Sequence, residues 1–328
     1  MIAVVLVGGE GTRLRPLTFT TPKQLLPIAG LPMIERVIAN LAHHGIDEVV
    51  LSMGYRPDAF VDAYPDERCA HVPLRYAIEP ELMDTAGAVR FAATWAGIDE
   101  RFVVVNGDVL TNLDLGALLA LHDERGAEAT ISLTPVDDPS RFGVVPTDET
   151  GRVLAFIEKP PPGEAPTNLI NAGTYVLEPS VLERIPGGRR VSIERETFPA
   201  LVDAGRLYAL ASDAYWIDTG TPETYLQANL DLIGASGLVE GAFIEAGAVV
   251  EHSVVGPGAR VAEGACVRNS VLLPGATVGP GARVERSVVG AGASVGMGAT
   301  IDELSVLGDG AVVADRAVLS GARVPQPA

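Results

Sequence analysis

The last third of the chain repeats every 17 residues, and this repeat limits the folds that the chain can adopt. The aliphatic residues that mark the period are Val250, Val267, Val284 and Ile301. Within a unit, aliphatic residues recur at steps of five or six, as from Val255 to Val261, with Gly-Ala turns between them. Each step predicts a short strand followed by a corner, so three steps predict one coil of a triangular parallel β-helix.

This tail resembles the left-handed hexapeptide-repeat helix, whose handedness departs from the usual right-handed crossover. We expect it to serve as a scaffold or a self-association surface, and the protein to be a homo-oligomer. Similar helices occur in acyltransferases, which use a coil histidine as base. The tail has a single histidine, His252 on its first coil, so an acyltransferase function is disfavoured.

The pattern before the repeat is different. Apolar strand-like runs alternate with helical patterns up to about Leu232, which predicts an α/β fold with a Rossmann-like, open and mostly parallel sheet. The chain of 328 residues therefore divides into a first domain of residues 1–234 and a left-handed β-helix of residues 235–328. Within the first domain we predict strands over residues 3–7, 48–51 and 103–105, and helices over residues 32–45 and 221–234.

Net charge and hydropathy limit the kinds of partner that the protein can bind. The formal net charge of −18 disfavours binding to nucleic acid or to an anionic membrane. Small phosphorylated ligands remain compatible, because local cations and backbone N–H groups act at short range. No apolar run reaches the roughly 18 residues of a membrane span and no basic leader is present, so we expect a cytoplasmic protein. Cys69 and Cys266 are expected to be small buried hydrophobes without a disulfide.

A glycine-rich turn directly after the first predicted strand carries the strongest chemical signal. Its sequence is Gly8-Gly9-Glu10-Gly11-Thr12-Arg13, and Arg15 and Lys23 follow it. Glycines let backbone N–H groups approach a phosphate, and the cations add full positive charge, so the turn predicts a triphosphate site. It is neither a P-loop, which needs Gly-Lys-Ser/Thr, nor a dinucleotide fingerprint, which needs glycine where Leu14 stands.

With the motifs that follow, the chain resembles the sugar-phosphate nucleotidylyltransferases, and within them the mannose-1-phosphate guanylyltransferases. Besides the glycine-rich turn, the motifs are Asn106-Gly107-Asp108, Phe142-Gly143-Val144-Val145, Glu158-Lys159-Pro160, Ile170-Asn171-Ala172-Gly173 and Trp216-Ile217-Asp218-Thr219-Gly220. The resemblance implies transfer of a nucleoside monophosphate from an NTP, with GTP favoured, to a sugar 1-phosphate, with mannose 1-phosphate favoured. Pyrophosphate is the second product, and the implied cofactor is Mg²⁺.

Such a reaction brings two anions together, so it needs positioning and charge neutralisation but no nucleophilic side chain. Asp108 and Asp218 each end a predicted strand, where α/β proteins bind ligands, and two carboxylates with phosphate oxygens and water suit Mg²⁺. The resemblance implies that Arg13 and Lys23 hold the β- and γ-phosphates and that Lys159 grips the sugar phosphate. Lys23 and Lys159 are the only lysines of the chain, which has 22 arginines.

The sugar is expected to meet Gly143, Glu158 and Asn171, with the carboxylate and the amide hydrogen-bonding its hydroxyls. The resemblance places Glu79 near the base, where a carboxylate complements the adjacent N1–H and N2–H₂ donors of guanine. The family usually has glycine where this chain has Asp84. The complete set of predicted nucleotide-binding residues is Leu6, Gly8, Gly9, Gly11, Thr12, Arg13, Lys23, Glu79, Thr85, Ala86 and Gly107.

Two other functions stay open. Within the enzyme class, the alternative is a glucose-1-phosphate thymidylyltransferase or uridylyltransferase. Thymine or uracil would offer the carboxylate one N–H donor, whereas guanine offers two. A non-catalytic regulatory homologue could keep the fold and the β-helix. It would have no chemical need for Arg13, Lys23, Asp108, Lys159 and Asp218 together.

Overall fold

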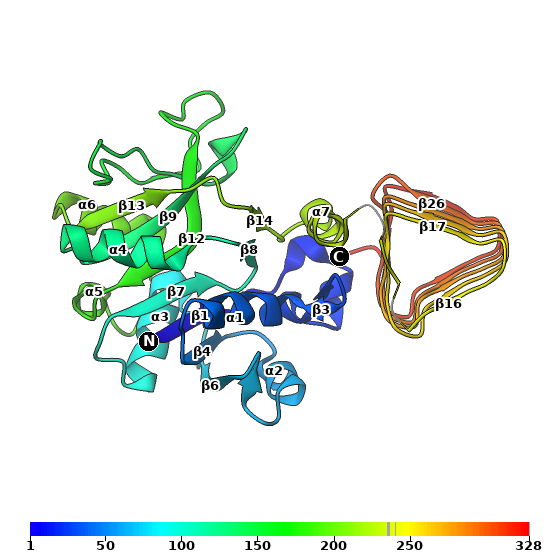
Figure 1. The fold of residues 1–328 in the computed structure, drawn as a ribbon, viewed down its shortest axis with the longest axis horizontal. Coiled ribbons are helices and arrows are strands. Elements are labelled where there is room, and N and C mark those ends of the chain that lie inside the picture. The colour runs from blue at the N-terminus through cyan, green and yellow to red at the C-terminus, as the bar shows by residue number, and fades with distance from the viewer. Residues whose placement is uncertain (235–236, 240, 328) are drawn as a thin grey trace. The chain divides into compact units, whose positions relative to one another are not determined.

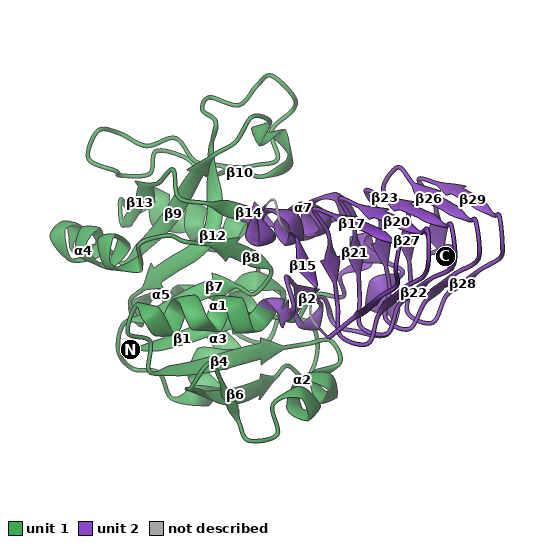
Figure 2. Ribbon diagram, turned by 45° about the vertical axis from the view of Figure 1, so that its right-hand side comes forward, with its two compact units in different colours: residues 1–9, 34–216 green, residues 10–33, 217–328 purple. Residues whose placement is uncertain are grey.

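The computed structural model describes residues 1–234, 237–239 and 241–327. Its chain forms two compact units (Figure 2): unit 1 comprises Met1–Gly9 and Ile34–Trp216, and unit 2 comprises Glu10–Met33 and Ile217–Ala328. The glycine-rich segment after Gly9 thus belongs to the same unit as the C-terminal repeat. The predicted first and last residues of the β-helix domain, 235 and 328, lie outside the described residues.

Unit 1 is built on four parallel strands, three of which were predicted from the sequence. The sheet runs in the order β7 (Phe102–Asn106), β1 (Ile2–Leu6), β4 (Glu48–Met53) and β6 (Val72–Ile78), all parallel. In register, Val4 pairs with Val50 on one side and Val104 on the other. All three valines are completely buried, as apolar runs in a two-sided parallel sheet must be.

The other half of this ten-stranded sheet is mixed, not mostly parallel. The central strand β12 (Leu169–Leu177) is antiparallel to both β7 and β9 (Ala129–Pro135). Between β9 and β12 the chain forms a single 3₁₀ turn and two short strands but no α-helix, and a chain that returns without a crossover α-helix pairs antiparallel. The remaining strands of the sheet are β5 (Arg68–Cys69), β10 (Gly143–Val144), β11 (Ile157–Glu158) and β13 (Leu207–Ala211).

Helices cover both faces of the sheet (Figure 1). On one face α3 buries Val89 and Ala93 in the same core as Val4 and Val50. The helical segments are α1 (Met33–His43), α2 (Pro57–Ala63), α3 (Asp84–Ala96), α4 (Leu115–Arg125), the 3₁₀ turn η4 (Pro139–Arg141), α5 (Ser180–Arg184), the π-helical η5 (Ile193–Thr197) and α6 (Phe198–Asp203). Two short strands, β8 (Val109–Thr111) and β14 (Trp216–Asp218), follow β7 and β13 along the chain.

Unit 2 begins with the glycine-rich segment, which folds into single turns and a tight hairpin: η1 (Thr12–Leu14), η2 (Leu17–Phe19), η3 (Lys23–Leu25), β2 (Pro27–Ile28) and β3 (Leu31–Pro32). The predicted helix after Thr221 is α7 (Pro222–Ile233). The Thr221 hydroxyl accepts a bond from the Thr224 N–H at 3.2 Å, and Gly234 follows the last turn. No helix in the described part of the chain is long and apolar enough to span a bilayer.

The repeat folds into the predicted left-handed parallel β-helix, whose coils stack into a triangle (Figure 1). Its three sheets are formed by β15 (Leu238–Val239), β18 (Val254–Val255), β21 (Val271–Leu272), β24 (Val288–Val289), β27 (Val306–Leu307) and β30 (Arg323–Val324); by β16 (Phe243–Ile244), β19 (Arg260–Val261), β22 (Thr277–Val278), β25 (Ser294–Val295) and β28 (Val312–Val313); and by β17 (Val249–Glu251), β20 (Cys266–Arg268), β23 (Arg283–Glu285), β26 (Thr300–Asp302) and β29 (Val318–Ser320).

The strand register explains the period. Val250, Val267, Val284 and Ile301 pair in succession, and Ile301 then pairs with Leu319, one residue out of phase. The repeated serines also stack inside the helix. The Ser253 hydroxyl accepts from the Ser270 N–H at 3.1 Å, and the Ser270 hydroxyl accepts from Ser287 in the same way. Each serine therefore satisfies a backbone donor of the next coil, which a valine there could not do.

Candidate active site

Several predicted ligand residues lie at the carboxyl edge of the parallel strands in unit 1. The backbone ladder continues past the strand ends, because the Gly107 N–H bonds the Leu6 carbonyl at 3.0 Å and the Glu79 N–H bonds the Met53 carbonyl at 2.9 Å. Gly8, Glu79 and Asp108 follow β1, β6 and β7. This edge is where open α/β sheets bind their ligands.

Gly8 lies against the Glu79 carboxylate. A Cβ built at Gly8 would be 3.3 Å from Glu79 Oε1 and 3.2 Å from the Gly54 nitrogen. A side chain there would therefore press on both strand ends. Gly54 was not among the predicted site residues, although it directly follows β4. The position of a glycine directly after a buried strand was the signal that could have found it.

Glu79 is a buried carboxylate with a fixed orientation. Only 9% of the residue is exposed. The Ser52 hydroxyl donates to Oε1 at 3.2 Å, and the Met83 N–H donates to Oε2 at 3.0 Å. Burial raises the pKa of Glu79, and the bonds from Met83 and Ser52 partly offset this rise. Each oxygen keeps a second lone pair, so the group can accept two donors from a ligand.

The segment after Glu79 enters α3 through an unusual backbone. Asp84 has φ +59, in the left-handed region that favours glycine, and its carboxylate lies 3.5 Å from the Arg190 guanidinium. The chain thus keeps a glycine-like conformation where the family usually has glycine. An aspartate tolerates this region better than most side chains do.

Thr85 and Ala86 anchor the start of α3. The Thr85 hydroxyl donates to Glu194 Oε2 at 2.8 Å and accepts from the Ile193 N–H at 2.8 Å. Ala86 is fully buried, and its N–H bonds the Val191 carbonyl at 2.9 Å. These contacts tie the helix start to the 191–194 segment. A contact of either residue with a nucleotide stays a prediction.

Asp108 owes its place to the glycine before it. A Cβ at Gly107 would lie 2.8 Å from Val7 Cγ1 and 2.9 Å from the Leu6 carbonyl oxygen. Only glycine lets the turn between β7 and β8 pass this close to β1. The turn leaves Asp108 half-buried at the sheet edge.

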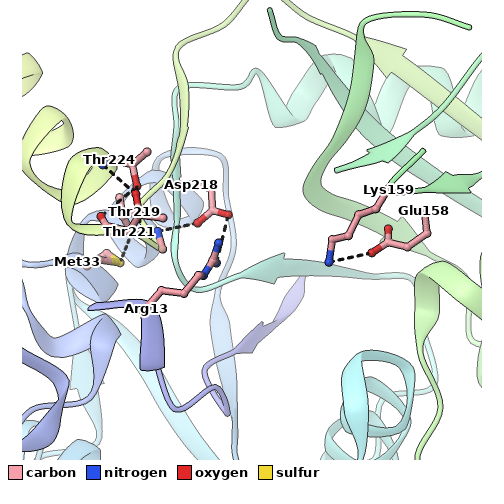
Figure 3. Close-up of polar contacts among 9 residues, drawn as sticks. Arg13, Met33, Glu158, Lys159, Asp218, Thr219, Thr221 and Thr224 are labelled. Carbon is pink, nitrogen blue, oxygen red and sulfur yellow. Dashed lines mark hydrogen bonds and ion pairs between the residues drawn. The ribbon is translucent and has the colours of Figure 1, made fainter. Parts of the chain in front are cut away.

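A lysine and a glutamate form a pair beside the β10–β11 hairpin. Lys159 Nζ lies 3.3 Å from Glu158 Oε1 (Figure 3), and the two side chains are 59% and 23% exposed. Gly143 pairs with Glu158 across the hairpin. A Cβ at Gly143 would be 2.7 Å from the Phe156 ring and 3.2 Å from Glu158 Oε2, so this glycine makes room for protein atoms.

Asn171 is held by a residue that the sequence analysis did not single out. Its Nδ2 donates to the Tyr175 hydroxyl at 2.9 Å, and its Oδ1 accepts from the Gly173 N–H at 3.2 Å. The strand is irregular between residues 171 and 175, which brings the two side chains together. Burial raises the pKa of Tyr175, and the Glu194 carboxylate adds to the rise. The amide keeps one N–H and one lone pair for a ligand.

In unit 2, Arg13 faces Asp218. The Arg13 Nη2 and Asp218 Oδ2 atoms are 4.0 Å apart (Figure 3), and the side chains are 59% and 28% exposed. Asp218 Oδ1 accepts from the Gly220 N–H at 2.7 Å. A Cβ at Gly220 would overlap the Arg13 guanidinium. An exposed pair at this distance contributes below about 1 kcal/mol, so Arg13 can turn to an anionic ligand at little cost.

Lys23 is the most buried of the predicted phosphate-binding cations, with 7% of the residue exposed. Gly11, at φ +63, packs so closely that its Cβ would be 3.1 Å from Lys23 Cβ and 3.0 Å from Thr18 Cγ2. The Thr18 hydroxyl closes this turn by bonding the Gly11 carbonyl at 2.8 Å. Thr12 is exposed and begins η1.

The two carboxylates predicted to bind metal belong to different units, Asp108 to unit 1 and Asp218 to unit 2. Both are half-buried, and carboxylate oxygen is the donor that hard divalent cations prefer. Among the described residues no three histidine, cysteine or acidic side chains converge as a zinc site would require. The donor chemistry of each carboxylate suits Mg²⁺, and a site shared by the two stays a prediction.

Comparison with known proteins gives the family. Residues 2–234 match the model of the nucleotidyl transferase family, and residues 232–327 match that of the GMPPB C-terminal domain. The mannose-1-phosphate guanylyltransferase of Mycobacterium tuberculosis is 44% identical over 233 residues, 70% of this chain and 64% of that protein. The probable mannose-1-phosphate guanylyltransferase 2 of Oryza sativa subsp. japonica is 40% identical over 263 residues, 77% of this chain and 72% of that protein.

The chain spans less than two thirds of the length of most of the curated relatives that it matches. In the mannose-1-phosphate guanyltransferase of Emericella nidulans, for example, it covers 62% of that protein. Among solved structures, HddC from Yersinia pseudotuberculosis is 30% identical with a TM-score of 0.61, over 70% of this chain and 99% of that one. A putative glucose-1-phosphate thymidylyltransferase from Bacillus anthracis is 25% identical with a TM-score of 0.63, over 70% and 94%. The chain belongs to the nucleotidyl transferase family.

Proposed function

We propose that the protein transfers GMP from GTP to mannose 1-phosphate, which yields GDP-mannose and pyrophosphate. Relatives that are 40–44% identical carry the name of this activity, and HddC has been solved with GMP-PN. The observation that carries the choice of base is Glu79, a buried carboxylate with an acceptor left on each oxygen. Guanine presents two adjacent donors to such a group, whereas thymine and uracil present one.

The reaction is a single displacement. A phosphate oxygen of mannose 1-phosphate forms a bond to the α-phosphorus of GTP. The bond from that phosphorus to the oxygen shared with the β-phosphate breaks, and pyrophosphate leaves with the electron pair. No proton has to move to or from carbon, so the protein supplies alignment and positive charge.

In this proposal Arg13 and Lys23 bind the β- and γ-phosphates. Their surroundings suit two different tasks: Lys23 is buried, whereas Arg13 is 59% exposed and weakly paired. Arg13 can therefore move with the pyrophosphate as it leaves, while Lys23 binds the β- and γ-phosphates in their position before the reaction. Asp108 and Asp218 would hold Mg²⁺, which when bound neutralises phosphate charge and aligns the α-phosphate.

Lys159 binds the phosphate of the sugar. In the free protein its ammonium is paired with Glu158 at 3.3 Å. Phosphate binding would draw the ammonium away and free the Glu158 carboxylate to accept hydrogen bonds from sugar hydroxyls. The remaining N–H and lone pair of Asn171, oriented by Tyr175, would bind the same ring.

A grid of reactions tests the proposal. Five NTPs (GTP, ATP, CTP, UTP and dTTP) are each combined with mannose 1-phosphate and with glucose 1-phosphate, and pyrophosphate release is measured with the full chain and Mg²⁺. We expect GTP with mannose 1-phosphate to give the highest kcat/KM. A preference for dTTP or UTP with glucose 1-phosphate would instead support the thymidylyl- or uridylyltransferase alternative, which the Bacillus anthracis neighbour suggests.

The Glu79→Gln variant sharpens this test. The glutamine keeps the side-chain volume and one acceptor oxygen. Its NH₂ group, however, is a donor and would face an N–H donor of guanine, so one hydrogen bond is lost. We expect kcat/KM for GTP to fall about 10- to 100-fold, as for a lost hydrogen bond to a charged group. The matched control is Glu81→Gln, an exposed glutamate two residues along. Equal losses in both variants, or none in Glu79→Gln, would reject Glu79 as the base-reading group.

A further inference from the structure

The last coil of the β-helix contacts the glycine-rich segment inside unit 2. Arg323, in β30, donates from Nη1 to the carbonyl oxygen of Arg13 at 2.9 Å and to that of Arg15 at 2.7 Å. These residues are 310 and 308 positions apart in the chain. A side chain from the end of the repeat thus grips the backbone on both sides of Leu14.

Two further contacts join the neighbouring coil, directly after β27, to the same segment. The Thr20 hydroxyl donates to the Asp309 carboxylate. A Cβ at Gly308 would lie 3.0 Å from Pro16 Cβ, so the coil and the segment are in close packing contact. The other oxygen of Asp309 accepts from the Ala291 N–H at 2.8 Å, which fixes that carboxylate to the preceding coil.

The gripped segment needs this support because it has little regular structure of its own. It consists of the three-residue turns η1 and η2, and Gly11, which precedes η1, has no side chain to cap it. Short helical turns leave carbonyl groups without intrahelical partners. A guanidinium satisfies such carbonyls well, since it offers several N–H donors and places positive charge at the carboxyl end of the turn.

The far end of the segment is anchored by another element. Within unit 2 the Tyr225 hydroxyl of α7 bonds the Pro27 carbonyl, and Asn229 Oδ1 accepts from the Ala29 N–H at 2.9 Å. Helix α7 therefore contacts residues 27–29 of the segment, and the β-helix contacts residues 13–20. Loss of the Arg323 contacts should therefore loosen only the first part of the segment.

We propose that Arg323 is a positioning residue, through which the last coil of the β-helix aims the Arg13 guanidinium at the nucleotide phosphates. This rests on the proposed role of Arg13. Arg323 acts through backbone carbonyls and touches no substrate. The β-helix then has a part in nucleotide binding, in addition to the scaffold role expected from its sequence.

The test uses the full chain and four variants. Arg323→Ala removes the grip, Arg323→Met keeps the stem without donors, and Arg323→Lys keeps a cation that can reach one carbonyl. The matched control is Arg268→Ala, which removes a β-helix arginine paired with Glu251 at 2.8 Å. Amide hydrogen exchange of residues 10–20 is measured without ligand, and KM is measured separately for NTP and sugar phosphate.

We expect exchange at residues 13–20 to be about tenfold faster in Arg323→Ala and Arg323→Met, and KM for the NTP to rise by about the same factor. KM for the sugar phosphate should stay within about twofold, Arg323→Lys should be intermediate, and Arg268→Ala should match the parent. Unchanged exchange in Arg323→Ala, or equal rises in both KM values, would overturn the proposal.

Failure of the proposed function is recognised separately. A parent protein that releases no pyrophosphate with any substrate pair would contradict the transferase proposal. The exchange experiment needs no substrate, so it still decides whether Arg323 orders the glycine-rich segment.

Discussion

The glycines around the site differ in why they are glycines. At Gly107 the reason is space, because a Cβ would lie 2.9 Å from a backbone oxygen of β1. At Gly11 it is backbone conformation, with φ +63. At Gly9 neither reason applies: apart from its two chain neighbours, no described residue has an atom within 4 Å of a Cβ built there, and its φ is not in the left-handed region. Gly9 is therefore open for a ligand and not required by the fold.

These differences predict opposite effects of the same substitution. Gly107→Ala should lower the free energy of unfolding by about 1–3 kcal/mol, because backbone and core atoms must shift. Gly9→Ala should leave stability within about 0.5 kcal/mol of the parent and weaken NTP binding instead. Urea unfolding and NTP titration of both variants measure this. Similar stability losses in the two variants would show that Gly9 has a structural role.

The two aspartates assigned to the metal should be needed for turnover and not for folding. Asp108→Asn and Asp218→Asn keep the side-chain volume but remove the charge that binds Mg²⁺. We expect kcat to fall at least about 100-fold, since several kcal/mol of charge stabilisation is lost. The control is Asp99→Asn, at an exposed position. Near-normal activity of either site variant at low Mg²⁺ would contradict the shared metal site.

The two lysines should separate the two substrates. Lys159→Met should raise KM for the sugar phosphate by about tenfold or more, and Lys23→Met should do the same for the NTP, since each removes a charged hydrogen bond. Steady-state kinetics with each substrate varied in turn measures both. If Lys159→Met affected the NTP alone, the assignment of the lysines would be reversed.

At the scale of elements, the β-helix and the parallel strands were predictable because each repeats a simple pattern. The middle coils place the same positions inside, such as Val261 and Val278 or Ser270 and Ser287, and the buried strands are continuous runs such as Val103–Val105. The antiparallel path of β12 was not predictable in this way. Its buried residues resemble those of a parallel strand, and its direction depends on the missing crossover helix.

The same limit applies to the residues that support the site. Motifs identified Glu79 and Asn171, but their partners Ser52 and Tyr175 lie within strands and look like ordinary core positions. The contact of Arg323 with the glycine-rich segment joins the two ends of the chain, and no local pattern marks it. Partners of this kind require three-dimensional packing to be found.

A buried histidine in helix α4 predicts how the stability of the protein depends on pH. His122 is completely buried, with Nδ1 2.8 Å from Thr130 Oγ1 and Nε2 3.1 Å from Glu178 Oε1. Burial lowers its pKa below the usual 6.5, against the opposing effect of Glu178. The unfolded chain therefore binds this proton at a higher pH than the folded protein does, so stability should fall as the pH drops below about 6.5.

Unfolding free energies from pH 7.5 to 5 check this. The parent should lose stability across that range, and His122→Gln should lose less of it, although it is less stable at pH 7.5. His43→Gln, at an exposed helix end, serves as the control and should follow the parent. A His122→Gln curve parallel to the parent would show that other groups cause the pH dependence.

At the scale of the whole molecule, the predicted site residues are shared between the two units. Unit 1 carries Glu79, Asp108 and Lys159, and unit 2 carries Arg13, Lys23 and Asp218. In the proposed reaction, unit 2 supplies the cations for the triphosphate, and unit 1 supplies the groups for the base and the sugar. Self-association through the β-helix remains a prediction, which the mass in solution by light scattering would test.

The central claim is a direct transfer between two bound phosphates, with no covalent intermediate on the protein. The stereochemical course at the α-phosphorus tests it most directly, with GTP made chiral at that atom by sulfur substitution and mannose 1-phosphate as acceptor. A single in-line displacement predicts inversion of configuration in the GDP-mannose formed. Retention would mean two displacements through a nucleotidylated side chain, and would contradict the account.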